Sequence, residues 1–338
     1  MIKKFFIVLS ITAALLLVAW ILWSRFIAPE EERYADVLDV TIAEGQQPIG
    51  GLVYIAEANH YFKEQGLNVT LQPHTSGKAA LNAILDGRAD LATTSETPIV
   101  FSTLANKKKV YIISTIGTTT EGIAIIARKD LGILKPSDLK GKKIGVTAGT
   151  NGAYFLDSFL LSNGIGKNEV ELINLKPEES VAAVLNGSVD AFSAWNPHLS
   201  TLQKRLAANG TTFYNKTIYL WTWNLVAGQD YVTRNPEIIG RVVKALVKAE
   251  DFAKGHPEES QKLIAAALNI SADELEWQWN IYKFRNSLTQ EMLMNAESQA
   301  TWAIENHLTT ASQLPNYLDY IYSDALEKIK PDSVTLIK

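Results

Sequence analysis

Cysteine is absent from the 338 residues of this chain. Its absence excludes disulfide bonds, thiol catalysis, thiolate metal sites and a lipid-modified N-terminal cysteine. The five histidines are scattered, without H-E-x-x-H or a similar spacing, so no metal site is predicted. The glycine-containing stretch 147–152 has neither the G-x-G-x-x-G spacing of dinucleotide sites nor the lysine of a phosphate loop. We therefore expect neither a metal nor a cofactor.

A concentrated positive charge is also lacking, because the formal net charge is −4 and no basic patch stands out. Nucleic acid is therefore excluded as a partner. The chain is 47% hydrophobic and 20% charged, which is typical of a folded globular protein. Its length allows two lobes with separate cores.

A long hydrophobic run occupies residues 5–23, and Lys3 and Lys4 precede it. The run is long enough to cross a bilayer as one helix, and the lysines place the N-terminus inside. A cleaved signal peptide is the alternative. We favour an uncleaved anchor because the run is long for a signal peptide and Pro29 disrupts the best cleavage site. Residues 1–37 are thus predicted to be a signal anchor and linker, with the remainder in the periplasm or outside the cell.

From Val40 onward the chain reads as strand, helix and strand, and it does so again about a hundred residues later. The repeat includes individual residues at an offset of 100: Ala83, Leu85, Gly87 and Asp90 recur as Ala183, Leu185, Gly187 and Asp190. Such alternation predicts βαβ units and parallel sheets, one in each of two α/β lobes. The two aspartates are interpreted as turn residues at strand entry. The chain from residue 235 to 338 is predicted to be mostly helical.

Ligands gather at the carboxyl ends of strands in such sheets, so we expect the loops that follow strands to face one cleft. The loops are residues 44–50, 74–78, 93–97, 147–152, 193–197 and 220–224. Their polar candidates for ligand binding are Gln46, Gln47, Ser76, Gly77, Thr94, Ser95, Thr150 and Asn151. The alternative for Ser76 and Thr150 is a helix cap in a tight turn.

Aromatic residues in or beside the same loops are candidate walls of the cleft. Trp195 precedes Pro197, and Trp221 and Trp223 alternate along a strand and so share one face. Tyr154 follows the 147–152 stretch and is expected to join them. A place in the core is the alternative for each tryptophan.

Several segments together resemble a known family. They are "GLVYIAEANHYFKEQGLNV", "LNAILDGRADLATTSETP", "SDLKGKKIGVTAGT" and "AWNP". In order and spacing they resemble the periplasmic substrate-binding proteins of ABC importers, in the nitrate, sulfonate, taurine and thiamine-pyrimidine precursor (NMT1/THI5-like) group. The resemblance implies a type II periplasmic-binding-protein fold with two lobes joined by two crossing strands. It places lobe 1 at 38–119, lobe 2 at 120–223, and the return of lobe 1 with the C-terminal helices at 224–338.

The function implied by this resemblance is capture of a small organic molecule between the lobes and its delivery to a membrane permease driven by an ATPase. No catalytic residue is predicted. Two alternatives stay open: an enzyme of the same fold, of the thiamine-pyrimidine or menaquinone pathway type, and a ligand-sensing partner of a membrane receptor.

Glu96 departs from the pattern expected of sulfonate binders, which carry small neutral residues in that loop. A carboxylate in a closing cleft is costly unless it is paired. We interpret Glu96 as a counter-charge for a cationic ligand group. The alternative is a carboxylate that is solvated or paired inside the scaffold.

Overall fold

Two β-sheets organise residues 36–105 and 109–337, which are the residues that this computed structural model describes. The larger sheet has the strand order β12-β11-β4-β10-β3-β1-β2 and the smaller one β7-β6-β8-β5-β9. The larger contains β1 (Leu38–Glu44), β2 (Leu67–Pro73), β3 (Leu91–Ser95), β4 (Val110–Thr119), β10 (Trp221–Gly228), β11 (Lys283–Thr289) and β12 (Val334–Thr335). The smaller contains β5 (Ile123–Arg128), β6 (Lys143–Val146), β7 (Glu171–Asn174), β8 (Ala191–Trp195) and β9 (Gly210–Phe213). The larger sheet with its helices is called here the large lobe, and the smaller sheet with its helices is called the small lobe.

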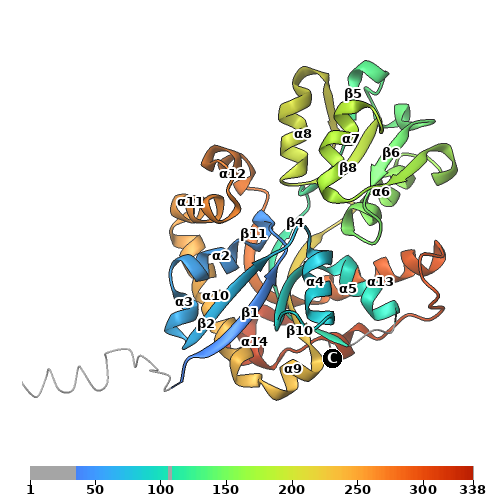
Figure 1. The fold of residues 1–338 in the computed structure, drawn as a ribbon. Coiled ribbons are helices and arrows are strands. Elements are labelled where there is room, and N and C mark those ends of the chain that lie inside the picture. Colours follow the sequence, from blue (N-terminus) through green and yellow to red (C-terminus); the bar gives the residue numbers. More distant parts are fainter. Residues whose placement is uncertain (1–35, 106–108, 338) are drawn as a thin grey trace, which may run out of the picture. The chain divides into compact units, whose positions relative to one another are not determined.

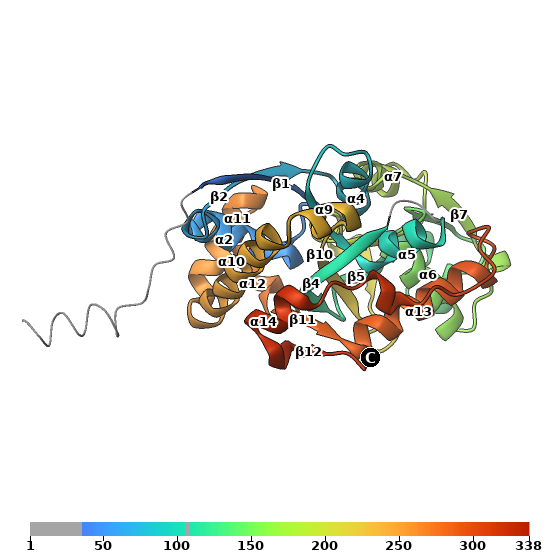
Figure 2. The ribbon, with the colours of Figure 1, turned by 90° about the horizontal axis from the view of Figure 1, so that it is seen from below.

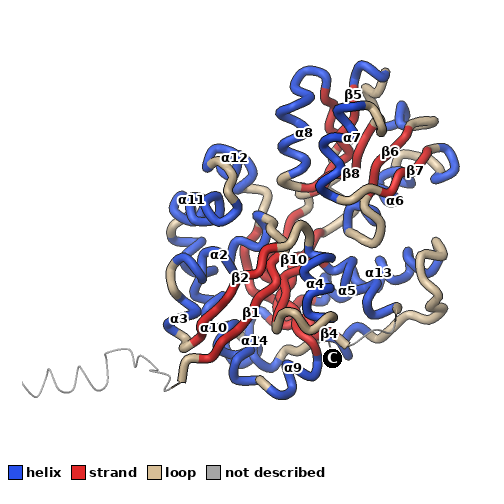
Figure 3. The backbone as a smooth tube through the Cα atoms, in the orientation of Figure 1, coloured by secondary structure: helices blue, strands red, loops and turns tan. Residues whose placement is uncertain are grey.

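Helices pack around both sheets (Figures 1 and 3). Those of the small lobe are α6 (Asn151–Ser162), α7 (Ser180–Asn186) and α8 (His198–Leu206). Those of the large lobe are α2 (Gly51–Ala58), α3 (Tyr61–Glu64), α4 (Gly77–Leu85), α5 (Glu96–Leu104), α9 (Gln229–Arg234), α10 (Pro236–Gly255), α11 (Pro257–Leu268), α12 (Ala272–Trp279), α13 (Gln290–Glu305) and α14 (Asp324–Ile329). The prediction of two α/β lobes, each with its own sheet, is confirmed.

The sequence repeat corresponds to a repeated strand arrangement. In the large lobe β1 pairs in parallel with β2 and β3, and in the small lobe β6 pairs in parallel with β7 and β8. The carboxylate of Asp90 accepts a hydrogen bond from the N–H of Thr41 at 2.8 Å, and that of Asp190 accepts one from Lys143 at 2.8 Å. Each aspartate thus joins the start of its strand to the neighbouring parallel strand, so the interpretation of both as strand-entry residues is confirmed.

Neither sheet is purely parallel, which corrects one expectation. Strand β10 runs antiparallel to β3 and β4, and β5 runs antiparallel to β8 and β9. The reason is topological, because the chain leaves the large lobe after Thr119 and returns at Trp221 with its direction reversed. Residues 221–223 therefore pair in the larger sheet, although the expected division assigned 120–223 to the second lobe.

Helix α10 shows how the C-terminal part covers the larger sheet. Pro236 occupies its first turn, where the missing N–H costs nothing. Ile239, Val242 and Leu246 recur at helical spacing and are fully buried in the main core. The amphipathic pattern predicted from residue 235 onward is thus a core-facing helix.

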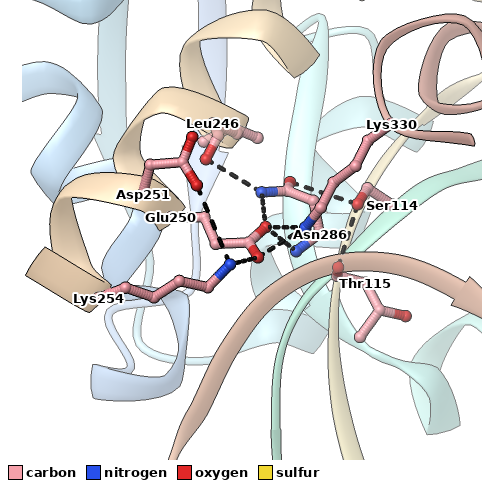
Figure 4. A network of polar contacts seen from close by, with 8 residues as sticks. All are labelled: Ser114, Thr115, Leu246, Glu250, Asp251, Lys254, Asn286 and Lys330. Atoms are coloured by element: carbon pink, nitrogen blue, oxygen red, sulfur yellow. Dashed lines mark hydrogen bonds and ion pairs between the residues drawn. The ribbon is translucent and has the colours of Figure 1, made fainter. Parts of the chain in front are cut away.

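A buried carboxylate on the same helix ties three distant segments together (Figure 4). The carboxylate of Glu250 is fully buried and accepts hydrogen bonds from Lys254 at 2.6 Å and from Lys330 at 2.6 and 2.7 Å. It also accepts from the backbone N–H of Asn286 at 2.8 Å and from its side-chain amide at 3.1 Å. Burial acts to raise the pKa of Glu250, but these bonds together outweigh it and hold the pKa below its ordinary value.

Within 36–105 and 109–337, none of the helices combines the length and hydrophobicity needed to cross a bilayer. The anchor predicted at residues 5–23 lies outside the described residues.

Candidate functional site

The carboxyl ends of strands from both lobes and the amino end of β10 meet around a small central cavity. Its volume is about 10 Å³, which is room for about one water molecule. Nine predicted residues line it: Gln47, Ser76, Gly77, Ser95, Thr150, Asn151, Trp195, Trp221 and Trp223. Lys78 and Pro98 complete the lining. Thr150, Asn151 and Trp195 come from the small lobe, so the cavity is shared between the lobes.

Two of the tryptophan rings pack closely against glycines. The rings of Trp221 and Trp223 lie 5.9 Å apart, edge to face. A Cβ on Gly77 would lie 2.8 Å from the ring of Trp223, and one on Gly152 would lie 2.9 Å from the ring of Trp195. A side chain at either glycine would therefore collide with an indole. This close approach explains the small residue at the end of the 147–152 stretch.

Direct hydrogen bonds connect the two lobes beside the cavity. With its amide turned to suit both neighbours, Gln47 accepts from Trp195 Nε1 at 3.2 Å and donates to the carbonyl oxygen of Asn196 at 2.5 Å. The ammonium group of Lys78 donates to the carbonyl oxygen of Ala148 at 2.8 Å. Beside the cavity the two lobes are therefore in direct contact.

Three buried N–H donors of the lining have no acceptor among the described residues. They are Asn151 Nδ2, Trp221 Nε1 and Trp223 Nε1. The three side chains are 5%, 2% and 2% exposed, so water does not satisfy these donors readily. Each buried donor without a partner costs about 1–3 kcal/mol. A ligand that brings oxygen acceptors would remove that cost.

Two polar candidates also have local hydrogen-bond partners, and Ser76 alone of the two makes a helix-cap bond. The hydroxyl of Ser76 accepts from the backbone N–H of Ala79 at 3.3 Å at the start of α4. The hydroxyl of Thr150 donates to the carbonyl oxygen of Thr147 at 2.7 Å. The alternative reading of Ser76 as a cap is therefore realised, while both residues still line the cavity.

Glu96 does not line the cavity. It is fully buried, and its carboxylate accepts hydrogen bonds from Tyr219, from the N–H and hydroxyl of Thr222 at 3.1 and 2.8 Å, and from Gln299 at 2.8 Å. Asn295 donates to it at 3.2 Å. Burial raises the pKa of Glu96, and these bonds offset that effect in part. The carboxylate thus fastens the returning chain to α13 and is paired inside the scaffold.

Three further candidates also lie outside the lining. Gln46 is exposed in a left-handed conformation, with its N–H bonded to Glu44 at 2.7 Å. Thr94 is buried and its hydroxyl donates to the carbonyl oxygen of Ser95 at 3.3 Å. The ring of Tyr154 packs edge-on against Tyr219 at 5.5 Å, outside the lining of the cavity.

Sequence reasoning did not single out Glu44, Lys78 or Pro98. Glu44 ends β1 beside the cavity loop and is 2% exposed. Burial raises its pKa to about 7, although hydrogen bonds from neighbouring groups lower it in part. The signal available for Lys78 was its place directly after Ser76 and Gly77 at a helix start. For Pro98 the sequence carried no comparable signal.

Comparison with curated proteins identifies relatives named for binding. A protein of Brucella abortus (strain 2308), named as a binding protein, is 29% identical over 246 residues, covering 71% of this chain and 73% of the relative. The taurine-binding periplasmic protein of Escherichia coli (strain K12) is 25% identical over 235 residues, covering 66% and 69%.

Solved structures share the fold at lower identity. The alkanesulfonate-binding protein SsuA of Xanthomonas axonopodis pv. citri, bound to MOPS, matches with a TM-score of 0.74 and 18% identity, covering 86% of this chain and all of that one. A variant of DszB with cysteine replaced by serine, in complex with biphenyl-2-sulfinic acid, matches with a TM-score of 0.62 and 16% identity, covering 86% and 98%. The family described as "NMT1/THI5 like" matches residues 49–260. Because that match spans more than half of the sequence, the chain belongs to the NMT1/THI5-like family.

Proposed function

We propose that this chain is an extracytoplasmic solute-binding receptor that captures a small organic molecule between its lobes and delivers it to an ABC importer. The observation that carries the proposal is the central cavity, which both lobes line and which holds three buried donors without acceptors among the described residues. Relatives named for binding, one of them periplasmic, support it. The moving bodies would be residues 38–119 with 221–338 on one side and 120–220 on the other, joined by the two crossing segments.

The bound group would be rich in oxygen acceptors, such as a sulfonate or a carboxylate. Asn151, Trp221 and Trp223 offer N–H groups, and Lys78 adds a positive charge to the lining. Charge-assisted hydrogen bonds to an anion would stabilise such a ligand. A cationic ligand was the expectation from Glu96, but that carboxylate accepts bonds from four side chains away from the cavity.

An enzyme of the same fold is the second candidate, because the desulfurization enzyme DszB shares the fold. The lining argues for binding instead. Its described residues include Ser, Thr, Asn, Gln and Lys but no carboxylate or histidine that could act as a general base. The chain also has no cysteine to act as a nucleophile. Incubation with the bound compound, followed by NMR, would distinguish binding from conversion.

We further propose that residues 5–23 keep the receptor on the membrane with the lobes outside, whereas cleavage would release it. The E. coli relative is named a periplasmic protein, which supports the side of the membrane but not the anchor. N-terminal sequencing of the mature protein distinguishes the two, since a chain that begins after residue 23 would rule out the anchor.

Ligand binding is expected to make the protein more compact in solution. In the absence of a ligand, contact between the lobes carries the cost of three buried donors that have no acceptor among the described residues, which favours lobe separation. A ligand that supplies acceptors would shift the population to the closed form. Small-angle scattering with and without the co-purified small molecule measures the change. Binding without a change in the radius of gyration would contradict closure.

Asn151→Ala is expected to weaken ligand binding by about 1–3 kcal/mol, because one hydrogen bond to the ligand is lost. Stability should change little, since Asn151 Nδ2 has no acceptor among the described residues. Calorimetric titration measures the affinity. Asn59→Ala is the matched control, because Asn59 Nδ2 is likewise buried without a partner but lies outside the lining. Equal affinities for the two variants would remove Asn151 from the site.

A further inference from the structure

A second, larger space lies between helices of the two lobes and is called here the side chamber. Its volume is about 570 Å³, within the range of small-molecule sites. It lies where α4, α5 and α13 of the large lobe face α6 of the small lobe, and Figure 2 shows α5, α6 and α13 next to one another. Two leucines of its lining, Leu172 and Leu308, are 40% and 46% exposed. The chamber therefore has a rim of its own at the protein surface.

The walls of the side chamber are largely apolar, and part of them is aromatic. They include Leu81, Phe101, Val146, Leu156 and Trp302. The rings of Phe101 and Trp302 lie 5.9 Å apart, edge to face. Contact with these walls would remove apolar ligand surface from water, and an aromatic ligand would add the edge-to-face contacts that such rings favour.

The carboxylate of the side chamber is already paired. Asp157 on α6 accepts a hydrogen bond from Trp302 Nε1 on α13 at 2.7 Å and forms an ion pair with Lys167. Lys167 also donates to the side-chain oxygen of Asn306 at 2.9 Å. The opposite charges of Asp157 and Lys167 thus compensate each other without a ligand.

The other polar groups of the lining also have partners within the protein. Lys78 donates to the carbonyl oxygen of Ala148 at 2.8 Å, and the side-chain oxygen of Asn174 accepts from the N–H of Ala148 at 2.9 Å. Among the described residues, no buried side-chain nitrogen or oxygen of this lining is without a hydrogen-bond partner, whereas the central cavity has three such donors. A charged ligand in the chamber would therefore lose hydration without satisfying a buried group.

We propose that the side chamber is a second ligand site, separate from the central cavity, and that it takes a neutral aromatic molecule. Its walls come from both lobes, so the molecule contacts both walls only while the lobes are together. Occupation of the chamber would therefore favour contact between the lobes. Only one consequence rests on the proposed receptor function: the two ligands would strengthen each other's binding, because such coupling is reciprocal.

Calorimetric titration of the full-length protein at pH 7 with 2-naphthol, a neutral two-ring compound, tests the site. One molecule should bind per chain with a negative heat-capacity change, which marks the burial of apolar surface. The anion 2-naphthoate has the same rings and should bind at least about tenfold more weakly, because its carboxylate loses hydration. Equal or tighter binding of 2-naphthoate would show that Lys78 attracts an anion and would overturn the neutral class.

Two variants assign the binding of 2-naphthol to the side chamber. Asn82 is exposed on α4 and lines the chamber, so the indole of Asn82→Trp should fill space there and lower the affinity at least about tenfold. Leu172→Glu places a carboxylate at the exposed rim and should also lower the affinity. Ala267→Trp, exposed on α11 outside both linings, is the matched control. Asn151→Ala alters only the central cavity and should leave the affinity within about twofold of the parent protein.

The outcomes separate this inference from the receptor function. Binding of 2-naphthol that is weakened in both chamber variants, but not in Ala267→Trp or Asn151→Ala, supports the second site. Absence of binding, or binding that survives both chamber variants, overturns the second site while the receptor function stands. Small-angle scattering with 2-naphthol should show compaction, and binding without compaction would overturn its effect on lobe contact. Compaction by the co-purified molecule decides the receptor function separately.

Discussion

Replacing Lys330 with methionine is expected to lower the free energy of unfolding by about 3 kcal/mol. Lys330 donates to both oxygens of Glu250, which is fully buried between α10 and β11. Methionine keeps most of the apolar stem but removes the charge, so the buried carboxylate loses one of the two cations that compensate its burial. Lys254 and Asn286 still bond to Glu250, which limits the loss. Urea unfolding at pH 7 measures the difference.

Three comparisons test this explanation. Lys328→Met, at an exposed position on α14 two residues before Lys330, should change stability by less than about 0.5 kcal/mol. Adding Glu250→Gln to Lys330→Met should recover part of the loss, because no buried charge remains. The pKa of Glu250 lies below its ordinary value, so its contribution is present at neutral pH and is lost as the pH falls through that lowered pKa. The effect of Lys330→Met should shrink accordingly in acid, and an effect that does not depend on pH would contradict the ionic explanation.

Replacing Glu44 with glutamine is expected to stabilise the protein by about 3 kcal/mol at pH 8. Burial raises the pKa of Glu44 to about 7 from an ordinary value of 4.5. The folded protein therefore binds more protons than the unfolded chain between those pH values, and the stability due to this group falls as the pH rises. Above pH 7 the full cost of a buried charge remains, at about 1.4 kcal/mol per pKa unit. Glutamine has the shape of the protonated acid and avoids that cost.

The measurement is the difference in unfolding free energy between Glu44→Gln and the parent protein from pH 4.5 to pH 8. Taking the difference cancels the titration of all other groups. The difference in unfolding free energy should be near zero at pH 4.5 and increase towards pH 8. Glu258→Gln, at an exposed position on α11, should show no such trend. A difference in unfolding free energy that is the same at pH 4.5 and at pH 8 would show that the pKa of Glu44 is not raised.

The two-lobed α/β architecture could be predicted because local chemistry repeats along the chain. Asp90 and Asp190 each accept a bond from the backbone of a neighbouring parallel strand, so the same residue types recur where the same strand junction recurs. The antiparallel course of β5 and β10 could not be read in this way. It depends on the direction in which the chain crosses between lobes, which hydrophobic periodicity does not encode.

The loops around the cavity could be predicted because ligands gather at the carboxyl ends of strands in such sheets. The direction of individual side chains could not be predicted. Glu96 and Ser95 are adjacent in sequence, yet Ser95 lines the cavity and Glu96 bonds to Tyr219, Thr222 and α13. Its partners Gln299 and Asn295 lie about two hundred residues away in sequence. Pairing over such a distance leaves no local pattern. Loop position therefore indicates proximity to a site but does not establish contact with a ligand.

The tryptophans at the lobe boundary give the protein an intrinsic optical reporter. Three of its eight tryptophans line the central cavity, Trp195 on one lobe and Trp221 and Trp223 on the other. With the lobes in contact, these three indoles are almost fully buried. Separation of the lobes would expose them to water and shift their emission to longer wavelength. Fluorescence of the unlabelled chain can therefore measure the equilibrium between lobes in contact and lobes separated. Stopped-flow mixing measures the rate at which that equilibrium responds to an added compound.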